Sequence, residues 1–315
     1  MLREQAETLR SERDKADEVT QFLQSVLVSA NPYRPGAAAT TLREVLDRGA
    51  LDVERRLRDR PEIRAQLYTA MAPAYFGLGE WTRAGDLAEK AVLLRRAVSG
   101  PDDPQLAASL VYLADVRLNQ LRAVEAEHHA LEALSIFRSL RGRSPGDTLR
   151  ALSTLGATLH KQGKLAEAGE VHGALLAAER LHRPVDVVRL AQFTRNVAHV
   201  MRDQRRYAEA TTLYAEAYAH HVAAFGRDHP ESANSAVNLG NAYFLAGDLA
   251  RALPLLREGV MTKRRRLGVT NPDVAGDQLT YARSLERAGR RVEAGRWRAE
   301  AEAVLARATK SARQK

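Results

Sequence analysis

Two glycines seven residues apart, Gly240 and Gly247, are the first feature of the sequence that could do chemistry. A phosphate-binding loop needs a glycine cluster that follows a strand and opens a helix, so that backbone N–H groups point at the anion. No β-branched run precedes Gly240, and the stretch GNAYFLAG lacks the closing Lys-Ser/Thr pair that contacts phosphate and metal. The two glycines therefore indicate a structural role rather than nucleotide binding.

Histidine and carboxylate side chains offer few further candidates. Glu125 and His129 lie one helical turn apart and His220 and His221 are adjacent, but neither pair has a third metal ligand in view. The stretch LHRPVD only mimics a kinase catalytic loop, because Pro184 follows and the required Asn is missing. The chain has no cysteine, which excludes disulfides and thiolate catalysis. We therefore expect no enzyme activity, no cofactor and no metal site.

The composition favours an all-α protein. The chain has 315 residues, of which 45% are hydrophobic, and Ala, Leu, Glu and Arg dominate while runs of Val, Ile and Thr are nearly absent. Its formal net charge of +9 favours acidic partners. No apolar stretch approaches the roughly 18 residues that span a bilayer, and the charged N-terminus is no signal peptide. We expect a cytoplasmic location, or an extracytoplasmic one if an upstream membrane helix precedes the chain.

A repeat period of about 42 residues decides the architecture. One small-residue column consists of Ala84, Ala126, Ala168, Ala210, Ala252 and Ala294. A second column lies twelve residues earlier, at Ala72, Ala114, Gly156, Ala198, Gly240 and Ala282. Such columns are typical of helix hairpins in which helix A crosses helix B, because only Ala or Gly lets the two axes approach closely.

The turn between helices A and B also repeats. Four repeats have a glycine there, which adopts the left-handed conformation at no steric cost: Gly79, Gly163, Gly247 and Gly289. Leu121 and Arg205 stand at the equivalent places in the second and fourth repeats, so we expect those two turns to use another geometry.

One hairpin cannot bury its apolar stripe alone, so neighbouring hairpins must stack. The sequence therefore predicts a right-handed α-solenoid of six 42-residue repeats over 61–308, a helical lead-in over 1–60 and a basic tail over 309–315. Thr41 and Glu44 have capping-box spacing before the last lead-in helix. Residues 31–40 read as a loop, and an earlier helix, over about 3–28, could pair as a coiled coil or pack on the first repeat.

The columns resemble those of tetratricopeptide repeats, specifically the 42-residue type of kinesin light chain and many bacterial proteins. The family spacing of Leu-Gly/Ala, then Ala, then a small residue is met at Leu239, Gly240, Ala252 and Gly259, and the family linker appears as GRDHP at 226–230. The resemblance implies a non-catalytic scaffold that binds a peptide or a partner domain. The lead-in is also similar to the segment that follows the membrane helix in bacterial serine/threonine kinases with such repeats, which implies, as an alternative, a regulatory or sensor arm in signalling.

In such an array, one face of every helix A lines a concave groove. With the column at Leu239 buried, the groove face falls at offsets of three and four residues. Arg side chains there suit carboxylates, amides suit a peptide backbone, and Phe244 suits an apolar anchor. The candidate peptide-binding residues are Arg150, His160, Lys161, Gln192, Arg195, His199, Arg202, Asn234, Asn241 and Phe244. The alternative is that these are ordinary solvated helix residues.

A third function is nucleic-acid binding through the basic surface. It is motivated by the +9 charge, by KRRR at 263–266 and by the tail ARATKSARQK. The KRRR run falls at the end of a helix B, where cations complement the helix dipole, and the groove face has few aromatic side chains for base stacking. We therefore expect an acidic protein or peptide partner rather than nucleic acid.

Overall fold

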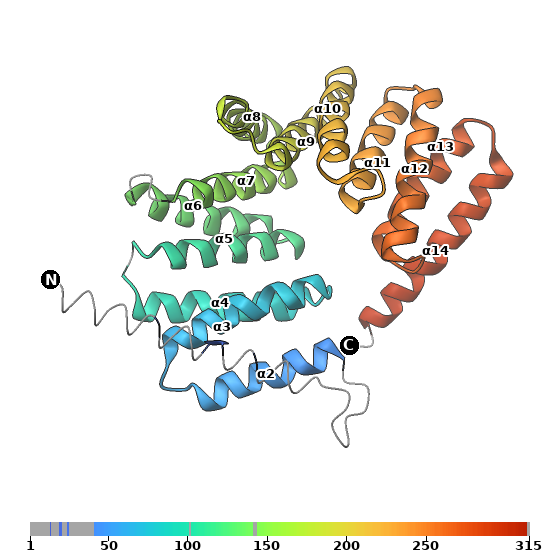
Figure 1. The fold of residues 1–315 in the computed structure, drawn as a ribbon. Helices are drawn as coiled ribbons and strands as arrows, with labels where there is room; N and C mark the ends of the chain where they lie inside the picture. Colours follow the sequence, from blue (N-terminus) through green and yellow to red (C-terminus); the bar gives the residue numbers. More distant parts are fainter. Residues whose placement is uncertain are drawn as a thin grey trace. The chain divides into compact units, whose positions relative to one another are not determined.

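The computed structural model describes residues 41–100, 102–140 and 144–313, with side chains to 308, and four isolated positions of the N-terminal segment. All regular structure in these residues is helical, and it confirms the predicted helical-repeat solenoid (Figure 1). The first helices are α2 Leu42–Arg56, α3 Pro61–Gly77, α4 Trp81–Val98, α5 Pro104–Asn119, α6 Ala123–Ser139 and α7 Pro145–Lys161. They are followed by α8 Leu165–Leu181, α9 Val187–Asp203, α10 Tyr207–Phe225, α11 Pro230–Leu245, α12 Leu249–Leu267, α13 Pro272–Arg287 and α14 Arg291–Arg313.

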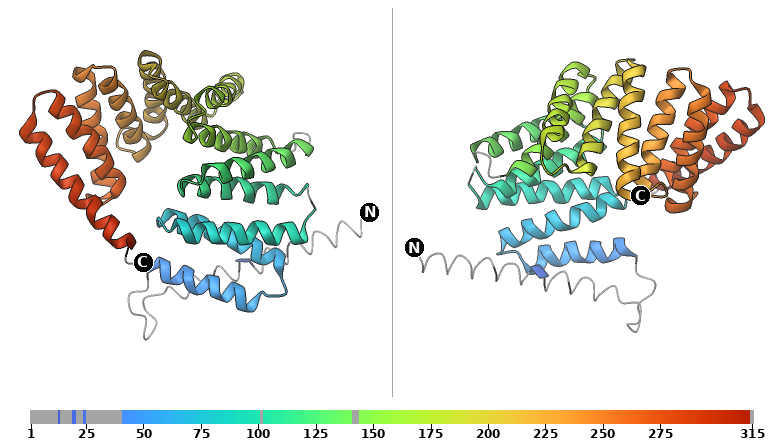
Figure 2. Two further views of the ribbon diagram at one scale, coloured as in Figure 1. Left: turned by 180° about the vertical axis from the view of Figure 1, so that it is seen from behind. Right: turned by 45° about the horizontal axis from the view of Figure 1, so that its top comes forward.

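The chain divides into two compact units, residues 1–163 and 164–315, each described by itself. In both units the odd-numbered helices from α3 onward serve as helix A and the even-numbered ones as helix B; Figure 2 shows the consecutive helices from two further sides. The predicted N-terminal helix over 3–28 and the loop over 31–40 lie outside the described ranges. The predicted division at residues 60 and 308 stays a prediction. None of the helices in the described part is long and apolar enough to cross a bilayer.

Helix starts follow the local sequence. The predicted capping box of α2 is confirmed: the Glu44 backbone N–H donates to the Thr41 hydroxyl oxygen at 3.3 Å, and the Thr41 N–H donates to the Glu44 carboxylate at 2.9 Å. Several of the described helices begin on a proline, whose missing N–H has no intrahelical partner at that position. These prolines are Pro61, Pro104, Pro145, Pro230 and Pro272.

The turns between helices A and B share one geometry, so the prediction of a different turn at Leu121 and Arg205 was wrong. Leu121 has a φ of 62° and Arg205 a φ of 63°, close to the 74° of Gly79 and the 87° of Gly247. The same backbone bond closes both of these turns, from the Arg122 N–H to the Arg117 carbonyl and from the Arg206 N–H to the Met201 carbonyl. The helix hairpin requires a left-handed backbone at this position whichever residue stands there. A residue whose side chain points into solvent is tolerated, at a cost in backbone strain.

The small-residue columns lie where helix A crosses helix B, as predicted. A Cβ atom on Gly240 would lie 2.8 Å from the Leu256 Cγ and 3.1 Å from the Ala252 carbonyl oxygen on the partner helix. A Cβ on Gly259 would lie 2.7 Å from the Ala233 carbonyl oxygen. Helices α11 and α12 are therefore in backbone contact at two levels, which only glycine permits.

Each unit has its own apolar core between helices A and B. Fully buried side chains in the N-terminal unit include Leu67, Tyr68 and Tyr75. In the C-terminal unit the corresponding side chains are Tyr214, Leu256, Tyr281 and Leu285. Burial of this apolar surface is the main stabilising contribution to both units.

Successive B helices are joined by ion pairs between side chains at a constant separation along the chain. In the N-terminal unit these are Asp47–Arg83, Glu54–Lys90 and Arg96–Glu132; in the C-terminal unit they are Arg180–Glu216 and Arg264–Glu300. The first two pairs link α2 to α4, so α2 occupies the place of a helix B in a preceding repeat. Helix α2 therefore extends the repeat register by one helix B.

Candidate peptide-binding face

The predicted binding residues lie on three A helices. Arg150, His160 and Lys161 lie on α7 of the N-terminal unit. The other seven lie on α9 and α11 of the C-terminal unit: Gln192, Arg195, His199, Arg202, Asn234, Asn241 and Phe244. A single groove that joins both groups stays a prediction.

Every arginine of the predicted cluster already has an acidic neighbour. The pairs are Arg195–Glu231 at 3.3 Å, Arg202–Asp203 at 2.8 Å and Arg150–Asp115 at 3.5 Å. Two of the three acids, Asp115 and Glu231, come from an adjacent repeat and not from the helix that carries the arginine. All three pairs are solvent-accessible, so each is worth at most about 1 kcal/mol. An incoming carboxylate can exchange with these acids at little cost.

His199 is held against the B helix of its own repeat. The Tyr214 hydroxyl and the His199 Nδ1 lie 2.6 Å apart, and the two rings meet edge to face with centroids 5.3 Å apart. Tyr214 on α10 is fully buried, and this burial raises the pKa of its phenol. The contact fixes the orientation of His199, so this side chain is a rigid part of the face.

Three amide side chains of the predicted set have no partner among the described residues. Gln192 is exposed and Asn234 and Asn241 are half-buried, and none has a side-chain hydrogen bond to another described residue. An amide both donates and accepts, so it can bind the C=O and N–H groups of an extended peptide. Asn234 and Asn241 lie seven residues apart and therefore on one face of α11.

Phe244 provides the apolar component and is itself supported by a cation. The Arg287 guanidinium of α13 lies 5.5 Å from the centroid of the Phe244 ring, and it donates a hydrogen bond to the Phe244 carbonyl oxygen at 3.3 Å. Phe244 is half-buried. Its ring combines an accessible apolar edge with a nearby positive charge. This arrangement suits a ligand in which an apolar residue is followed or preceded by an acidic one.

On α7, the structure adds a half-buried carboxylate to the predicted residues. Asp115 of α5 accepts hydrogen bonds from the Thr154 hydroxyl at 2.7 Å and from Arg150. Burial raises the pKa of the Asp115 carboxyl above its usual range, and the bonds from Thr154 and Arg150 oppose that shift. Arg150 is therefore paired with Asp115 in a solvent-accessible contact, while Lys161 is exposed and has no partner among the described residues.

One cluster in the described part of the chain has the residue types of a metal site. His128, His129 and Glu132 of α6 offer ligand atoms within 4.8 Å of one another. Both Glu132 oxygens, however, accept from the Arg96 guanidinium at 2.7 Å. A cation therefore already neutralises the only carboxylate of the cluster, and the donor set does not fit a metal ion.

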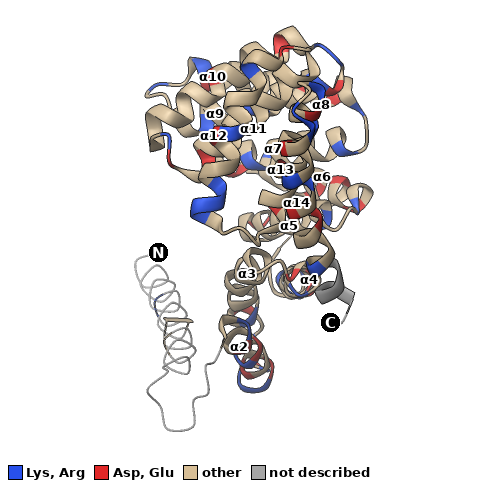
Figure 3. Cartoon of the chain, turned by 90° about the vertical axis from the view of Figure 1, so that its right-hand side faces the viewer, with Lys and Arg blue, Asp and Glu red and all other residues tan. Residues whose placement is uncertain are grey.

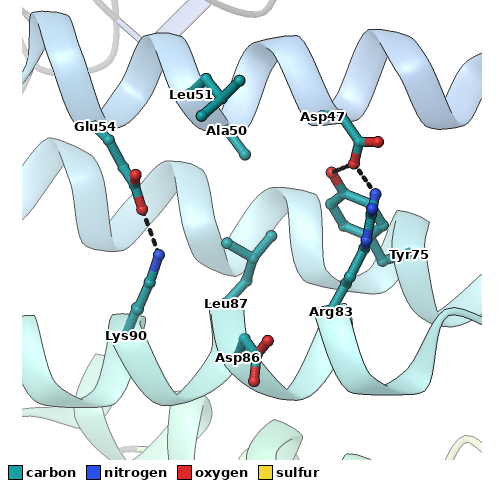
Figure 4. A pocket seen from close by; sticks show the side chains of 9 residues that line it. All are labelled: Asp47, Ala50, Leu51, Glu54, Tyr75, Arg83, Asp86, Leu87 and Lys90. Carbon is teal, nitrogen blue, oxygen red and sulfur yellow. Dashed lines mark hydrogen bonds and ion pairs between the residues drawn. The ribbon is translucent and has the colours of Figure 1, made fainter. Parts of the chain in front are cut away.

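A charge-lined cavity of the N-terminal unit lies between α2 and α4 rather than on the helix A face (Figure 4). It has a volume of about 460 Å³, and ion pairs close both ends. At one end, Asp47 accepts from Arg83 and, at 2.7 Å, from the Tyr75 hydroxyl; at the other, Glu54 accepts from Lys90. The apolar middle is formed by Ala50, Leu51 and Leu87. The charges at its two ends are paired, and the remaining acid of the lining, Asp86, is exposed to solvent.

Comparison with known proteins supports the repeat assignment. The tetratricopeptide repeat family model matches residues 63–139 and 189–260, which cover α3 to α6 and most of α9 to α12. This match indicates no enzyme family. No curated protein matches the chain.

Solved structures share the fold at low sequence identity. The BtubC (BKLC) protein of P. vanneervenii is 21% identical, with a TM-score of 0.59 over 73% of this chain and 92% of that one. The kinesin light chain TPR-like repeats of Podosopora anserina are 20% identical, with a TM-score of 0.54 over 66% of this chain and 98% of that one. A Rap protein complexed with competence and sporulation factor is 14% identical, with a TM-score of 0.61 over 94% of this chain and 86% of that one.

These matches and the 42-residue hairpins agree in register, since both matched segments begin within a helix A and end within a helix B. They do not test the resemblance of the lead-in to kinase-associated segments, which stays a prediction. The chain carries tetratricopeptide repeats over residues 63–139 and 189–260, and it shares its fold with kinesin-light-chain-like repeat proteins.

Proposed function

We propose that the chain is a non-catalytic interaction scaffold that binds an extended, acidic peptide segment along the helix A faces of α9 and α11. The observation that carries this proposal is the set of free amides at Gln192, Asn234 and Asn241 beside Arg195 and Arg202. Tetratricopeptide repeats are interaction modules as a family, and the structure of a Rap protein with competence and sporulation factor is a complex of a protein with the same fold.

The chemistry of recognition has two components. The amides of Asn234 and Asn241 hydrogen-bond the peptide backbone, which is independent of sequence and favours an extended ligand. Acidic side chains of the ligand then exchange with Glu231 and Asp203 for the guanidinium groups of Arg195 and Arg202. Because each existing pair is solvent-accessible and weak, such an exchange adds specificity at low cost.

A peptide-display selection tests this proposal. Twelve-residue random peptides are selected against the full chain, and the affinity of an enriched peptide is measured for the wild type, for Asn234→Ala/Asn241→Ala and for Arg195→Glu/Arg202→Glu. We expect each double variant to lose about tenfold or more in affinity, since every 1.4 kcal/mol is a factor of ten. Helicity should be unchanged, because these side chains lie outside the apolar core.

Arg251→Glu/Arg290→Glu is the matched control. Both arginines are exposed, and each is paired with an acid three residues away at the start of a helix B, Asp248 for Arg251 and Glu293 for Arg290. Their reversal changes the net charge as much as Arg195→Glu/Arg202→Glu does but leaves the A face intact. Wild-type affinity in the two helix A variants, or an equal loss in the control, would place the binding surface elsewhere on the molecule.

A further inference from the structure

One position near the end of helix B is polar in four repeats although it faces the next helix A and is buried there. In register, this position holds Arg95, Phe137, Glu179, His221, Lys263 and Leu305. The four polar side chains are each more than nine-tenths buried. Buried polar and charged groups require partners in the protein or in a ligand, because desolvation otherwise destabilises the fold.

Three of these four positions have the partner they require. Glu179 accepts from the Arg189 guanidinium at 2.5 and 3.0 Å, and Lys263 donates to the Asp277 carboxylate at 2.5 Å. The Nδ1 of His221 lies 2.6 Å from the Ser235 hydroxyl. The two charged residues are therefore neutralised by an opposite charge at the start of the next helix A, ten or fourteen residues later in the chain.

Arg95 has no such counter-charge. It is only 7% exposed, yet its one hydrogen bond is to a neutral acceptor, the Gln105 side-chain oxygen, at 2.5 Å. Its Nε has no hydrogen-bond partner, and no carboxylate in the described part of the chain lies within ion-pair distance. Burial lowers the pKa of Arg95, and the nearby Asp103 only partly opposes this shift.

A pocket opens beside this unneutralised guanidinium. It has a volume of about 210 Å³ and lies between α3, α4 and α5, the first three helices of the repeat array (Figure 1). Gln66 and Gln105 line it together with Arg95, and the Gln66 side-chain oxygen is also buried without a partner. Two acids line the pocket as well: Glu62, which is exposed to water, and Asp103, which accepts from the Gln105 backbone N–H at 2.9 Å as the cap of α5.

We propose that this pocket binds a carboxylate, which supplies the counter-charge that Arg95 lacks within the chain. A carboxylate accepts two parallel N–H bonds from one guanidinium, and its small size suits the pocket. The amide of Gln66 can turn its NH2 group toward the same anion, since a half-turn about its terminal C–C bond exchanges its oxygen and nitrogen. The proposal does not depend on the peptide-binding face, because Arg95 lies on α4 and that face lies on α9 and α11.

The carboxylate can come from a free small acid or from an acidic side chain of a partner protein. The experiment separates these sources with two probes, both titrated calorimetrically into the full chain at constant ionic strength with NaCl. One probe is sodium glutarate. The other is the capped tripeptide acetyl-Gly-Glu-Gly-amide, with acetyl-Gly-Gln-Gly-amide as its neutral control.

We expect saturable binding of at least one carboxylate probe by the wild-type chain, and no binding of the neutral tripeptide. Tighter binding of the Glu tripeptide than of glutarate identifies a partner side chain as the source, and binding of glutarate alone identifies a free acid. Arg95→Met should weaken the binding tenfold or more. Arg96→Met is the matched control, because Arg96 is adjacent to Arg95 but exposed and paired with Glu132. The affinity of this variant for the carboxylate probe should stay at the wild-type value.

Gln105→Glu distinguishes binding from folding. It places a carboxylate where the Gln105 oxygen now accepts from Arg95, so it should raise the thermal unfolding midpoint and at the same time abolish binding of both carboxylate probes. A misfolded variant would lower that midpoint instead. No saturable binding by the wild type, or wild-type affinity in Gln105→Glu, would overturn the proposal.

Discussion

At the scale of single residues, Leu121 and Arg205 hold a left-handed backbone that four other repeats assign to glycine. For a residue with a side chain, this conformation costs about 1–2 kcal/mol of strain in the folded state. Glycine avoids that strain, but its more flexible unfolded chain lowers the free energy of unfolding by about 0.4–1 kcal/mol. Leu121 is 85% exposed, so its side chain contributes little packing. The difference of the two effects predicts that Leu121→Gly and Arg205→Gly each stabilise the protein by about 0.5 kcal/mol. Chemical denaturation followed by circular dichroism measures this change.

The reverse substitution is the control for this prediction. Gly79 has the same conformation, and a Cβ atom there would meet no other atom within 4 Å. Gly79→Leu should therefore destabilise the protein by about 0.5 kcal/mol, because backbone strain exceeds the gain from a less flexible unfolded chain. Loss of stability in Leu121→Gly would show that the leucine side chain, rather than the turn, determines the preference at this position.

Residue types also limited what could be predicted about the site. The amides at Asn234 and Asn241 and the ring of Phe244 follow from the helix A register, and the structure leaves the amides free of described partners. The acidic partners of Arg150 and Arg195 could not be deduced in the same way. Asp115 and Glu231 lie in neighbouring repeats, and the offset between repeats is a property of their stacking, not of any single helix.

At the scale of elements, α10 and α11 meet around a histidine. His221 is almost fully buried, its Nδ1 lies 2.6 Å from the Ser235 hydroxyl, and its ring stacks on Phe225, which in turn stacks on His229. Burial lowers the pKa of His221 below its usual value; the nearby Arg195, His220 and His229 add to that shift, and Glu231 opposes it. Its neutral form is therefore part of the packed interface.

The sign of the pH dependence follows from this shift. The unfolded chain binds a proton at His221 near pH 6.5, whereas the folded chain does so only at lower pH, so stability is fully present above about pH 6.5 and falls as the pH decreases below it. The free energy of unfolding, measured between pH 8 and pH 5, should fall less steeply in His221→Gln than in the wild type. An unchanged slope in His221→Gln would contradict the assignment.

The elements themselves were largely predictable, because the repeat period places small residues, turns and prolines in every repeat at once. The fifth helix A, for example, spans Pro230–Leu245, with the proline at its first position and Gly247 in the turn that follows it. The polar position at Arg95, Glu179 and Lys263 obeys the same period, but its chemistry changes sign from repeat to repeat. A search for recurring residue types misses such a column, whereas a search for recurring buried positions finds it.

At the scale of the whole molecule, the formal net charge of +9 is the excess of 48 Lys and Arg residues over 39 Asp and Glu residues. Lys and Arg alternate with Asp and Glu along the helices (Figure 3), and many of the described cations are paired with acids of an adjacent repeat, as in Arg180–Glu216 and Arg264–Glu300. Three of the arginines in the predicted face are paired as well. A nucleic-acid-binding surface needs several unpaired Lys or Arg side chains on one face, so that they can contact several phosphates at once.

The affinity for nucleic acid should accordingly be weak. The affinity for a peptide should depend much less on salt concentration than that of a nucleic-acid-binding protein does for its ligand. We expect no binding of a 30-base-pair DNA duplex by the full chain at 150 mM NaCl in fluorescence anisotropy, at protein concentrations up to about 10 μM, where non-specific DNA binders with dissociation constants near 1 μM would be detected. For a selected acidic peptide, the logarithm of affinity should fall with the logarithm of salt with a slope near −1 to −2, since two arginines exchange their acids. A slope of −5 or steeper for DNA, with binding at 150 mM NaCl, would instead show that the excess cations act together as a phosphate-binding surface.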